Sequence, residues 1–203
     1  TTQLGFGRRT GQINCSPEVN LVEQTKFLGI TIDSSLSWTP HIDQLCNRLN
    51  SSLYALKQVK EIGDLTTART AYFALFEAHI RYGLAVWGGT SNANMTRILI
   101  LQKKAIRILA NLHFQESCRE VFATLKILTV TALYIQEVIL YVDRENLSRL
   151  EDLHYYNTRN STMYPLPIHH LAQYEKKTIL HRKKAEQLST DRNKNEEGET
   201  AKD

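Results

Sequence analysis

The stretch HIDQLCNRLNSSLYALKQVKEIG, residues 41–63, decides the fold because its apolar side chains recur every three or four positions. That spacing is the period of an α-helix with one face against a core. The pattern begins at Pro40 and ends near Gly63, so the sequence predicts one long amphipathic helix here. The apolar stripe comprises Ile42, Leu45, Cys46, Leu49, Leu53 and Leu56.

Further segments downstream carry the same helical period. Asp64 is placed to cap a second helix that runs to about Trp87, where Gly88 and Gly89 stop it. The shared side of that helix is expected to hold Ala68, Tyr72, Leu75, Phe76 and His79. The remaining predicted elements are a helix over 92–110, a short element near 118–125 and a helix over 131–142. Short loops favour antiparallel neighbours, so we expect a mainly α fold with residues 37–145 as an antiparallel helical bundle.

The residues on either side of this region have a different character. Residues 19–22 and 27–32 are rich in branched and aromatic side chains, which predicts two strands within a small β part over residues 1–36. Beyond Arg144 the apolar period fades. We therefore expect an irregular C-terminal extension over 146–188 and a disordered tail over 189–203.

The composition excludes several classes of protein. No apolar run is long enough to cross a membrane and the N-terminus lacks a secretory pattern, so we expect an intracellular protein, nuclear or cytoplasmic. Cys15, Cys46 and Cys118 lie far apart with no C-x-x-C pair, which favours reduced thiols, with Cys46 buried. Neither H-E-x-x-H nor a Cys/His quartet occurs, so no metal site and no cofactor are expected.

The positive charge of the chain is concentrated in one region. The net charge is +4, and six basic but two acidic residues lie between positions 91 and 126. At about 100° per residue, the cations of the helix over 92–110 share roughly a third of its circumference, and the other side holds Ile98, Leu101, Ala105, Ile108 and Leu109. Those cations are Arg97, Lys103, Lys104 and Arg107. An ordinary solvated helix face and a surface that contacts phosphates both fit, but the absence of Asp and Glu between Asn92 and Gln115 favours phosphate.

Five phrases in a fixed order carry a resemblance to a known family. They are FLGITID (27–33), SWTPHID (37–43), LQKKAIRIL (101–109), ILTVTALY (127–134) and HYYNTRN (154–160). Together they resemble the C-terminal part of reverse transcriptases of non-LTR retrotransposons of the LINE type, and look most like the Jockey branch. The resemblance covers roughly residues 27–180. It implies terminal palm strands, a helical thumb and a region that follows the thumb.

The same resemblance implies specific roles for some residues. Phe27, Leu28 and Gly29 match the strand that supports the primer end in that family, and a glycine within a strand allows close approach of another backbone. The paired carboxylates that hold two Mg²⁺ ions in the family's catalytic turn have no counterpart in this sequence, because Asp33, Asp43 and Asp64 read as strand-end or helix-cap residues. We therefore expect no catalytic residue, and Mg²⁺ only in the intact polymerase.

Tyr155, Tyr156 and Arg159 form another candidate site. Interleaved aromatic rings and a cation suit stacking on single-stranded bases. Docking of this segment onto the helical bundle explains the same residues and is the favoured alternative.

These observations predict a fragment of a retrotransposon RNA-directed DNA polymerase without its catalytic carboxylates. Its expected role is to bind template–primer nucleic acid, which is RNA, DNA or their hybrid, and an intact reverse transcriptase acting in trans is a candidate partner. No membrane partner is expected. The alternative is a helical protein-interaction module or a relic product without function.

Overall fold

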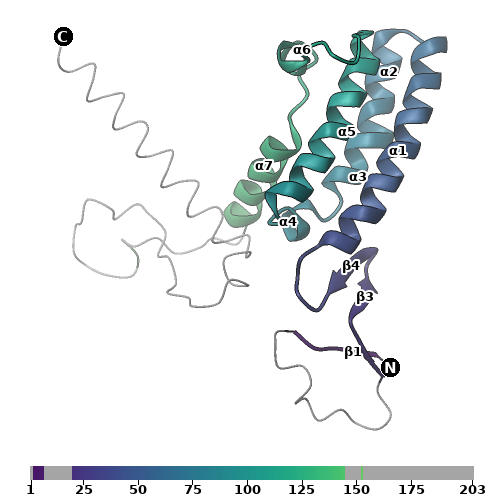
Figure 1. Ribbon diagram of the computed structural model, residues 1–203. Helices are drawn as coiled ribbons and strands as arrows, with labels where there is room; N and C mark the ends of the chain where they lie inside the picture. Colours follow the sequence, from purple (N-terminus) through teal and green to yellow (C-terminus); the bar gives the residue numbers. More distant parts are fainter. Residues whose placement is uncertain (1, 7–19, 145–151, 153–203) are drawn as a thin grey trace. The chain divides into compact units, whose positions relative to one another are not determined.

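The structure, a computed structural model, describes residues 2–6, 20–144 and 152 (Figure 1). The described part is mainly helical, as the sequence predicts. Two compact units divide the chain, Thr1–Leu133 and Tyr134–Asp203. The first unit is described below, and the four-part domain division expected from the sequence stays a prediction. Its elements are β1 (Thr2–Leu4), β2 (Asn20–Val22), β3 (Gln24–Phe27), β4 (Ile30–Asp33), α1 (Thr39–Ile62), α2 (Leu65–Ala71), η2 (Tyr72–Glu77), α3 (Ala78–Arg81), α4 (Leu84–Trp87), α5 (Asn92–Ala110) and α6 (Arg119–Thr124).

Helix α1 confirms the helix predicted by the opening stretch, and every residue of the predicted apolar stripe is buried. Its start is fixed by the preceding loop, in which the Asp33 carboxylate accepts hydrogen bonds from the backbone amides of Ser37 and Trp38, each at 3.0 Å. Burial alone would raise the pKa of Asp33, but these bonds and one from the Ser35 hydroxyl lower it. Asp33 is therefore a structural brace of this loop.

Helix α2 returns along α1 in the opposite direction. The loop between them is short, and the predicted cap is confirmed because the Asp64 carboxylate accepts a bond from the Thr67 amide at 2.8 Å. Further along, the Ser52 hydroxyl of α1 donates to the Leu75 carbonyl at 2.8 Å. This pair is antiparallel, as short connections favour.

The predicted single helix over 64–87 is wrong in two respects. First, Tyr72–Glu77 is a π-helix, and the buried apolar residues recur every four positions at Ala68, Tyr72, Phe76 and Ile80, which leaves Leu75 and His79 exposed. Second, the helix breaks at Gly83, where φ is +64° and a Cβ would lie 2.5 Å from the Cδ1 atom of Ile30. Glycine is favoured there, because the backbone is left-handed and a larger residue would have to displace the end of the Ile30 side chain.

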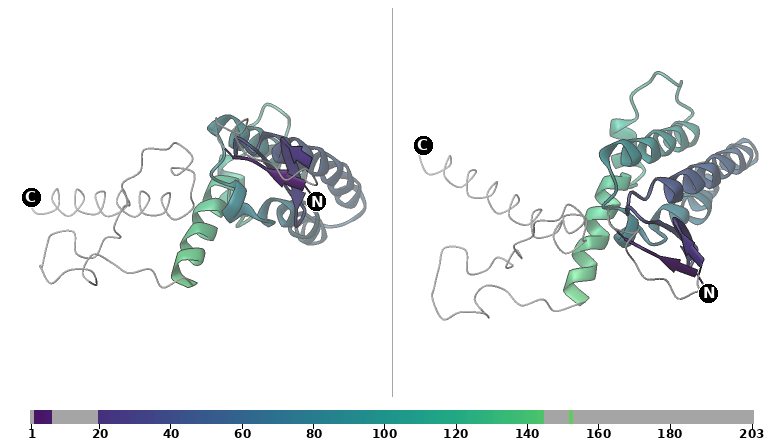
Figure 2. Two further views of the ribbon diagram at one scale, coloured as in Figure 1. Left: turned by 90° about the horizontal axis from the view of Figure 1, so that it is seen from below. Right: turned by 60° about the horizontal axis from the view of Figure 1, so that its bottom comes forward.

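Helix α5 matches its predicted bounds and runs in the same direction as α1. Near the start of both helices, the Asn94 amide donates to the Thr39 hydroxyl at 3.2 Å. Figure 1 shows α1, α2 and α5 side by side, and both figures place β3 and β4 at the N-terminal end of α1 (Figure 2). Helices α1 and α5 are not consecutive in the chain, and they run in the same direction because the segment from α2 to α3 returns the chain before α5 begins.

The strand predicted over residues 27–32 is a hairpin instead. Strands β3 and β4 are antiparallel, and Phe27 pairs with Ile30 across the two-residue turn Leu28–Gly29. Both turn residues have positive φ, 46° and 78°, as a type I′ turn requires. Gly29 is therefore a turn residue and not a strand residue that admits another backbone. The parallel pair β1 and β2 forms a separate small sheet, and β2 lies within the strand predicted over 19–22.

A buried amide ties α5 to two other segments. The Gln102 amide nitrogen donates to the Tyr72 hydroxyl and to the Leu128 carbonyl, each at 2.9 Å. Its oxygen accepts from the Val130 amide at 2.8 Å. Gln102 is fully buried, so these three bonds satisfy polar groups that water cannot reach. Burial also raises the pKa of Tyr72 above its ordinary value.

Four further expectations concern parts of the chain that the structure describes. Helix α6 confirms the short element near 118–125, and α7 (Val130–Arg144) confirms the last predicted helix. Cys46 and Cys118 are free and buried, and Cys15 lies outside the described residues. Among the described helices, none combines the length and the apolar character that a membrane crossing requires.

Candidate nucleic-acid interface

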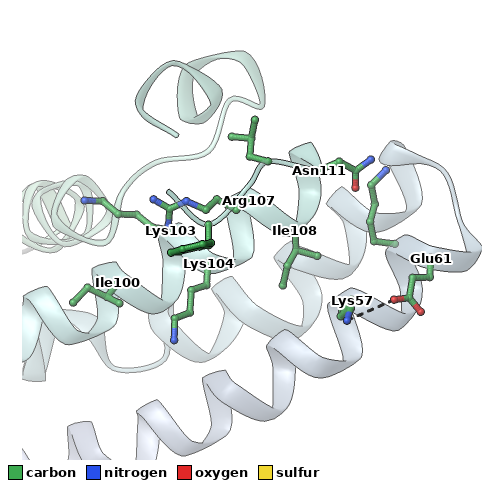
Figure 3. A pocket seen from close by; sticks show the side chains of 11 residues that line it. Lys57, Glu61, Ile100, Lys103, Lys104, Arg107, Ile108 and Asn111 are labelled. Atoms are coloured by element: carbon green, nitrogen blue, oxygen red, sulfur yellow. Dashed lines mark ion pairs between the residues drawn. The ribbon is translucent and has the colours of Figure 1, made fainter. Parts of the chain in front are cut away.

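A groove opens between the C-terminal halves of α1 and α5 (Figure 3). Its volume is about 830 Å³, which lies in the range of sites for small molecules, roughly 300–1,000 Å³. In Figure 3 the Lys104 and Ile108 side chains of α5 extend toward α1. The lining residues are Lys57, Lys60, Glu61, Ile100, Lys103, Lys104, Arg107, Ile108, Asn111, Leu112 and Phe114.

The charge of this groove is strongly unbalanced. Of the described side chains that line it, five are cationic and one, Glu61, is acidic. The Lys57 ammonium lies 3.9 Å from the Glu61 carboxylate, and both side chains are more than half exposed. An exposed pair at that distance contributes little stability, and among the described lining residues the other four cations have no carboxylate to balance them. The groove therefore presents a positive surface to solvent.

Helical geometry explains how α5 contributes three of these cations. Lys103, Lys104 and Arg107 lie three or four positions apart or adjacent, so they share one face of the helix. The opposite face is buried in the core, as predicted for Ile98, Leu101 and Leu109. The predicted apolar face also held Ala105, which is buried, and Ile108, which lines the groove.

Two of the five cations also have a structural role. Lys60 lies in the last turn of α1 and Arg107 in the last turn of α5, where positive charge stabilises the negative end of the helix dipole. The Arg107 Nε also donates to the Glu116 carbonyl at 3.1 Å. Lys103 and Lys104 lie more than one turn before the end of α5, so the helix dipole does not account for them.

Arg97 does not join the other predicted cations. Its guanidinium lies at the opposite end of α5, where the Nη2 atom is 2.6 Å from the Asp43 carboxylate of α1. The hydrogen bond from Arg97 to Asp43 raises the pKa of the arginine. Arg97 does not line the groove, so the predicted four-cation row is split into an ion pair and a cluster of three.

A second, smaller hollow lies between α5 and α6. Its volume is about 380 Å³, and Lys103 and Arg107 line it as well as the larger groove. On its other side lies Arg119, the first residue of α6. Lys103 and Arg107 thus stand between two hollows that both have cationic walls.

Sequence reasoning missed Lys57 and Lys60. Both lie on α1, for which the sequence predicted only an apolar stripe. No local pattern connects these two lysines to α5. The signal that could have drawn attention to them is their own spacing, since cations three positions apart near a helix end share one face. Their approach to Lys103 and Lys104 depends on how the two helices pack.

The remaining predicted site residues lie elsewhere. Phe27, Leu28 and Gly29 form the tip of the β3–β4 hairpin, where Phe27 and Leu28 are 63% and 73% exposed. The Tyr82 hydroxyl donates to the Leu28 carbonyl at 2.5 Å. A role for this tip stays a prediction. Tyr155, Tyr156 and Arg159 lie outside the described residues. Within residues 2–6, 20–144 and 152, no group of three or more His, Cys, Asp or Glu residues could hold a metal ion.

Comparison with known proteins gives matches in sequence. The chain is 27% identical over 124 residues, 60% of its length, to a probable RNA-directed DNA polymerase from transposon BS of Drosophila melanogaster. It is 24% identical over 108 residues, 52% of its length, to the corresponding protein from transposon X-element of the same species. The matched regions span only 14% and 12% of these relatives. No family model and no solved structure matches the chain. By sequence, this is a protein related to the reverse transcriptases of transposons.

Proposed function

We propose that the groove between α1 and α5 binds the phosphate backbone of RNA, DNA or their hybrid without preference for sequence. The observation that carries the proposal is the convergence of five cations from two helices on one groove that holds a single carboxylate. Lysine and arginine side chains that lie together on one surface can contact successive phosphates. Such contacts supply most of the affinity for nucleic acid that does not depend on base sequence. The relation to RNA-directed DNA polymerases supports nucleic acid as the ligand class.

Within such a polymerase, the helices would have a thumb-like role. They would hold the template–primer beside the reaction centre and supply no catalytic group. The hairpin tip Phe27–Gly29 is the second proposed contact, at the primer end, because its apolar side chains are exposed at a fixed turn. In this arrangement α1 and α5 bind the backbone and the hairpin limits where the strand end lies.

The test neutralises groove cations without disturbing the fold. Lys57, Lys103 and Lys104 are exposed, so the triple variant K57Q/K103Q/K104Q removes three charges from the groove. Arg107 is left intact because it holds the Glu116 carbonyl. The matched control R48Q/K126Q/R144Q removes the same charge from exposed positions that neither line the groove nor adjoin the hairpin tip. Helical content is checked for both by circular dichroism.

Binding of a labelled oligonucleotide of mixed sequence is measured over a range of salt concentrations. Five phosphate contacts predict a slope of log affinity against log salt of about −3.5 to −4.5. The groove variant should flatten that slope by about 2 to 3, whereas the control should leave it nearly unchanged. Equal loss in both variants, or no loss in a folded groove variant, would refute the proposal.

The rival function is a helical protein-interaction module. The exposed apolar side chains in the groove, Ile100 and Phe114, favour it because an acidic amphipathic helix would match both the charge and the apolar lining. Binding of an acidic amphipathic peptide, together with no salt-dependent binding of any oligonucleotide, would establish this rival.

A further inference from the structure

Phe114 is an exposed aromatic residue that lines the cationic groove. Its side chain is 70% exposed, and it shares the groove with Lys104 and Arg107. The His113 ring lies 4.8 Å from the Phe114 ring, at an interplanar angle of 47°. One aromatic face therefore lies next to a row of positive charges.

The loop that carries Phe114 is held on both sides of this residue. Asn111 ends α5 in the left-handed conformation, and the Leu112 amide donates to the Arg107 carbonyl at 3.0 Å. After Phe114, the Glu116 amide donates to the His113 carbonyl at 3.1 Å, and the His113 amide donates to the Glu116 carboxylate at 3.0 Å. The exposed ring is thus presented by a bonded loop.

We propose that the groove accepts a single nucleic-acid strand, with one base stacked on Phe114 and the neighbouring phosphates at Lys103, Lys104 and Arg107. This inference rests on the proposed function and adds the strandedness of the ligand. A phosphate backbone alone makes no use of an aromatic face or of the apolar lining from Ile100 and Ile108. An unstacked base uses both, because every base has an apolar π-face that stacks on aromatic side chains.

A duplex fits this arrangement less well. Its bases are already stacked on one another, so Phe114 could contact only the backbone or a duplex end. Single-stranded RNA and single-stranded DNA share the required chemistry, a phosphate with an accessible base. The test therefore includes both strands as separate probes.

The first experiment removes the ring with F114A and compares it with Y54A. Tyr54 is a matched control because it is also 70% exposed and does not line the groove. Loss of one stacked base predicts a five- to about 150-fold weaker affinity for a single strand. The salt slope should not change, since no charge is removed. Y54A should bind like the unmodified protein.

The second experiment varies the ligand. A strand with abasic positions keeps its phosphates but offers no base, so F114A should lose little affinity for it. Duplex of the same length should also be insensitive to F114A. The variant F114W should bind single strands normally. Binding of a strand should quench the tryptophan fluorescence of F114W more than that of the unmodified protein, which has no tryptophan at position 114.

The outcomes separate the two proposals. If F114A weakens intact, abasic and duplex ligands equally, or weakens none, the stacking inference is wrong while groove binding stands. If duplex binds more tightly than single strands of either kind, the inference is likewise wrong. Unchanged binding in K57Q/K103Q/K104Q instead refutes the proposed function, and the stacking inference with it.

Discussion

At the N-terminal end of the α1–α5 pair, Arg97 lies 2.6 Å from Asp43, whereas at the C-terminal end Lys103 and Lys104 line a groove that holds five cations and one carboxylate. The N-terminal end also holds the Asn94–Thr39 hydrogen bond and the loop that Asp33 braces. Cations at one end are thus used to join helices, and cations at the other end remain available to a ligand. Two lysines and an arginine on one helix face are available to bind a ligand only where no acidic side chain of the neighbouring helix pairs with them.

The largest effect is expected from removing the buried amide that holds α5 in place between these two ends. Q102A leaves the Tyr72 hydroxyl, the Leu128 carbonyl and the Val130 amide without their partner. The bonds to Tyr72 and Val130 are buried, and each buried unsatisfied group costs about 1–3 kcal/mol, so the free energy of unfolding should fall by about 2 kcal/mol or more. Chemical denaturation followed by circular dichroism measures this.

The matched control is Q115A, which makes the same change at an exposed loop residue and should leave stability nearly unaltered. A loss below about 1 kcal/mol for Q102A would show that the three bonds contribute little. In Q102A, the contacts at both ends of the α1–α5 pair should be lost together, because α5 contributes to each end.

A smaller effect, confined to the N-terminal end, is expected from G83A. The left-handed backbone at Gly83 costs an L-residue about 1–2 kcal/mol, and the added Cβ would also meet the Cδ1 atom of Ile30 at 2.5 Å. Thermal unfolding should show the loss, while the salt slope of nucleic-acid binding stays unchanged. The double variant G83A/I30V, which lacks that Cδ1 atom, should recover part of the stability. If G83A/I30V recovered no stability, the whole loss in G83A would come from the left-handed backbone and none from the contact with Ile30.

The His41 contact should make the same end sensitive to pH. The Thr31 amide donates to His41 Nδ1 at 3.4 Å, and burial, followed by the nearby Arg48 charge, lowers the pKa of His41 below its ordinary value of 6.5. The unfolded state then binds more protons than the folded state as pH falls below about 6.5. Stability is fully present above that pH and declines toward the folded pKa.

Protonation removes the acceptor for Thr31, a bond worth about 1 kcal/mol. Denaturation across pH 5 to 8, at constant ionic strength, should show a steeper loss on the acid side for the unmodified protein than for H41Q. Identical pH profiles would contradict this assignment. Groove binding measured at the same pH values supplies a readout that His41 does not directly affect.

The smallest effect is expected from the Arg97–Asp43 pair itself. Its side chains are 44% and 55% exposed, so a double-mutant cycle of R97Q and D43N should give a coupling of at most about 1 kcal/mol. R97Q should leave the salt slope of oligonucleotide binding unchanged, in contrast to K57Q/K103Q/K104Q. If R97Q flattened the salt slope of oligonucleotide binding as much as K57Q/K103Q/K104Q does, the cations at the two ends would not differ in their role.

The sequence predicted the parts of the fold that depend on neighbouring residues. The bounds of α5, the Asp64 cap and the buried stripe of α1 follow from side chains three or four positions apart and from one capping residue. Lys103, Lys104 and Arg107 shared a face for the same reason. These features are local because helical hydrogen bonds and side-chain neighbours lie within one turn.

The sequence misplaced features whose cause lies far along the chain. Residues 27–32 favour extended backbone and predict one strand, yet Leu28 and Gly29 turn the chain back where the Tyr82 hydroxyl donates to the Leu28 carbonyl. The sequence predicts a continuous helix over 64–87, but the helix breaks at Gly83, which lies against Ile30. Contacts of this kind override local preference.

By itself, then, the sequence determined where helices form, which face of α5 is basic, and the relation to transposon polymerases. Only the tertiary structure decided which cations act together, because α1 and α5 pack in the same direction and bring Lys57 and Lys60 to Lys103 and Lys104 while pairing Arg97 with Asp43. The physical reason is range: a helix period is set within one turn, whereas the relative direction and register of two helices are set by packing across the whole unit.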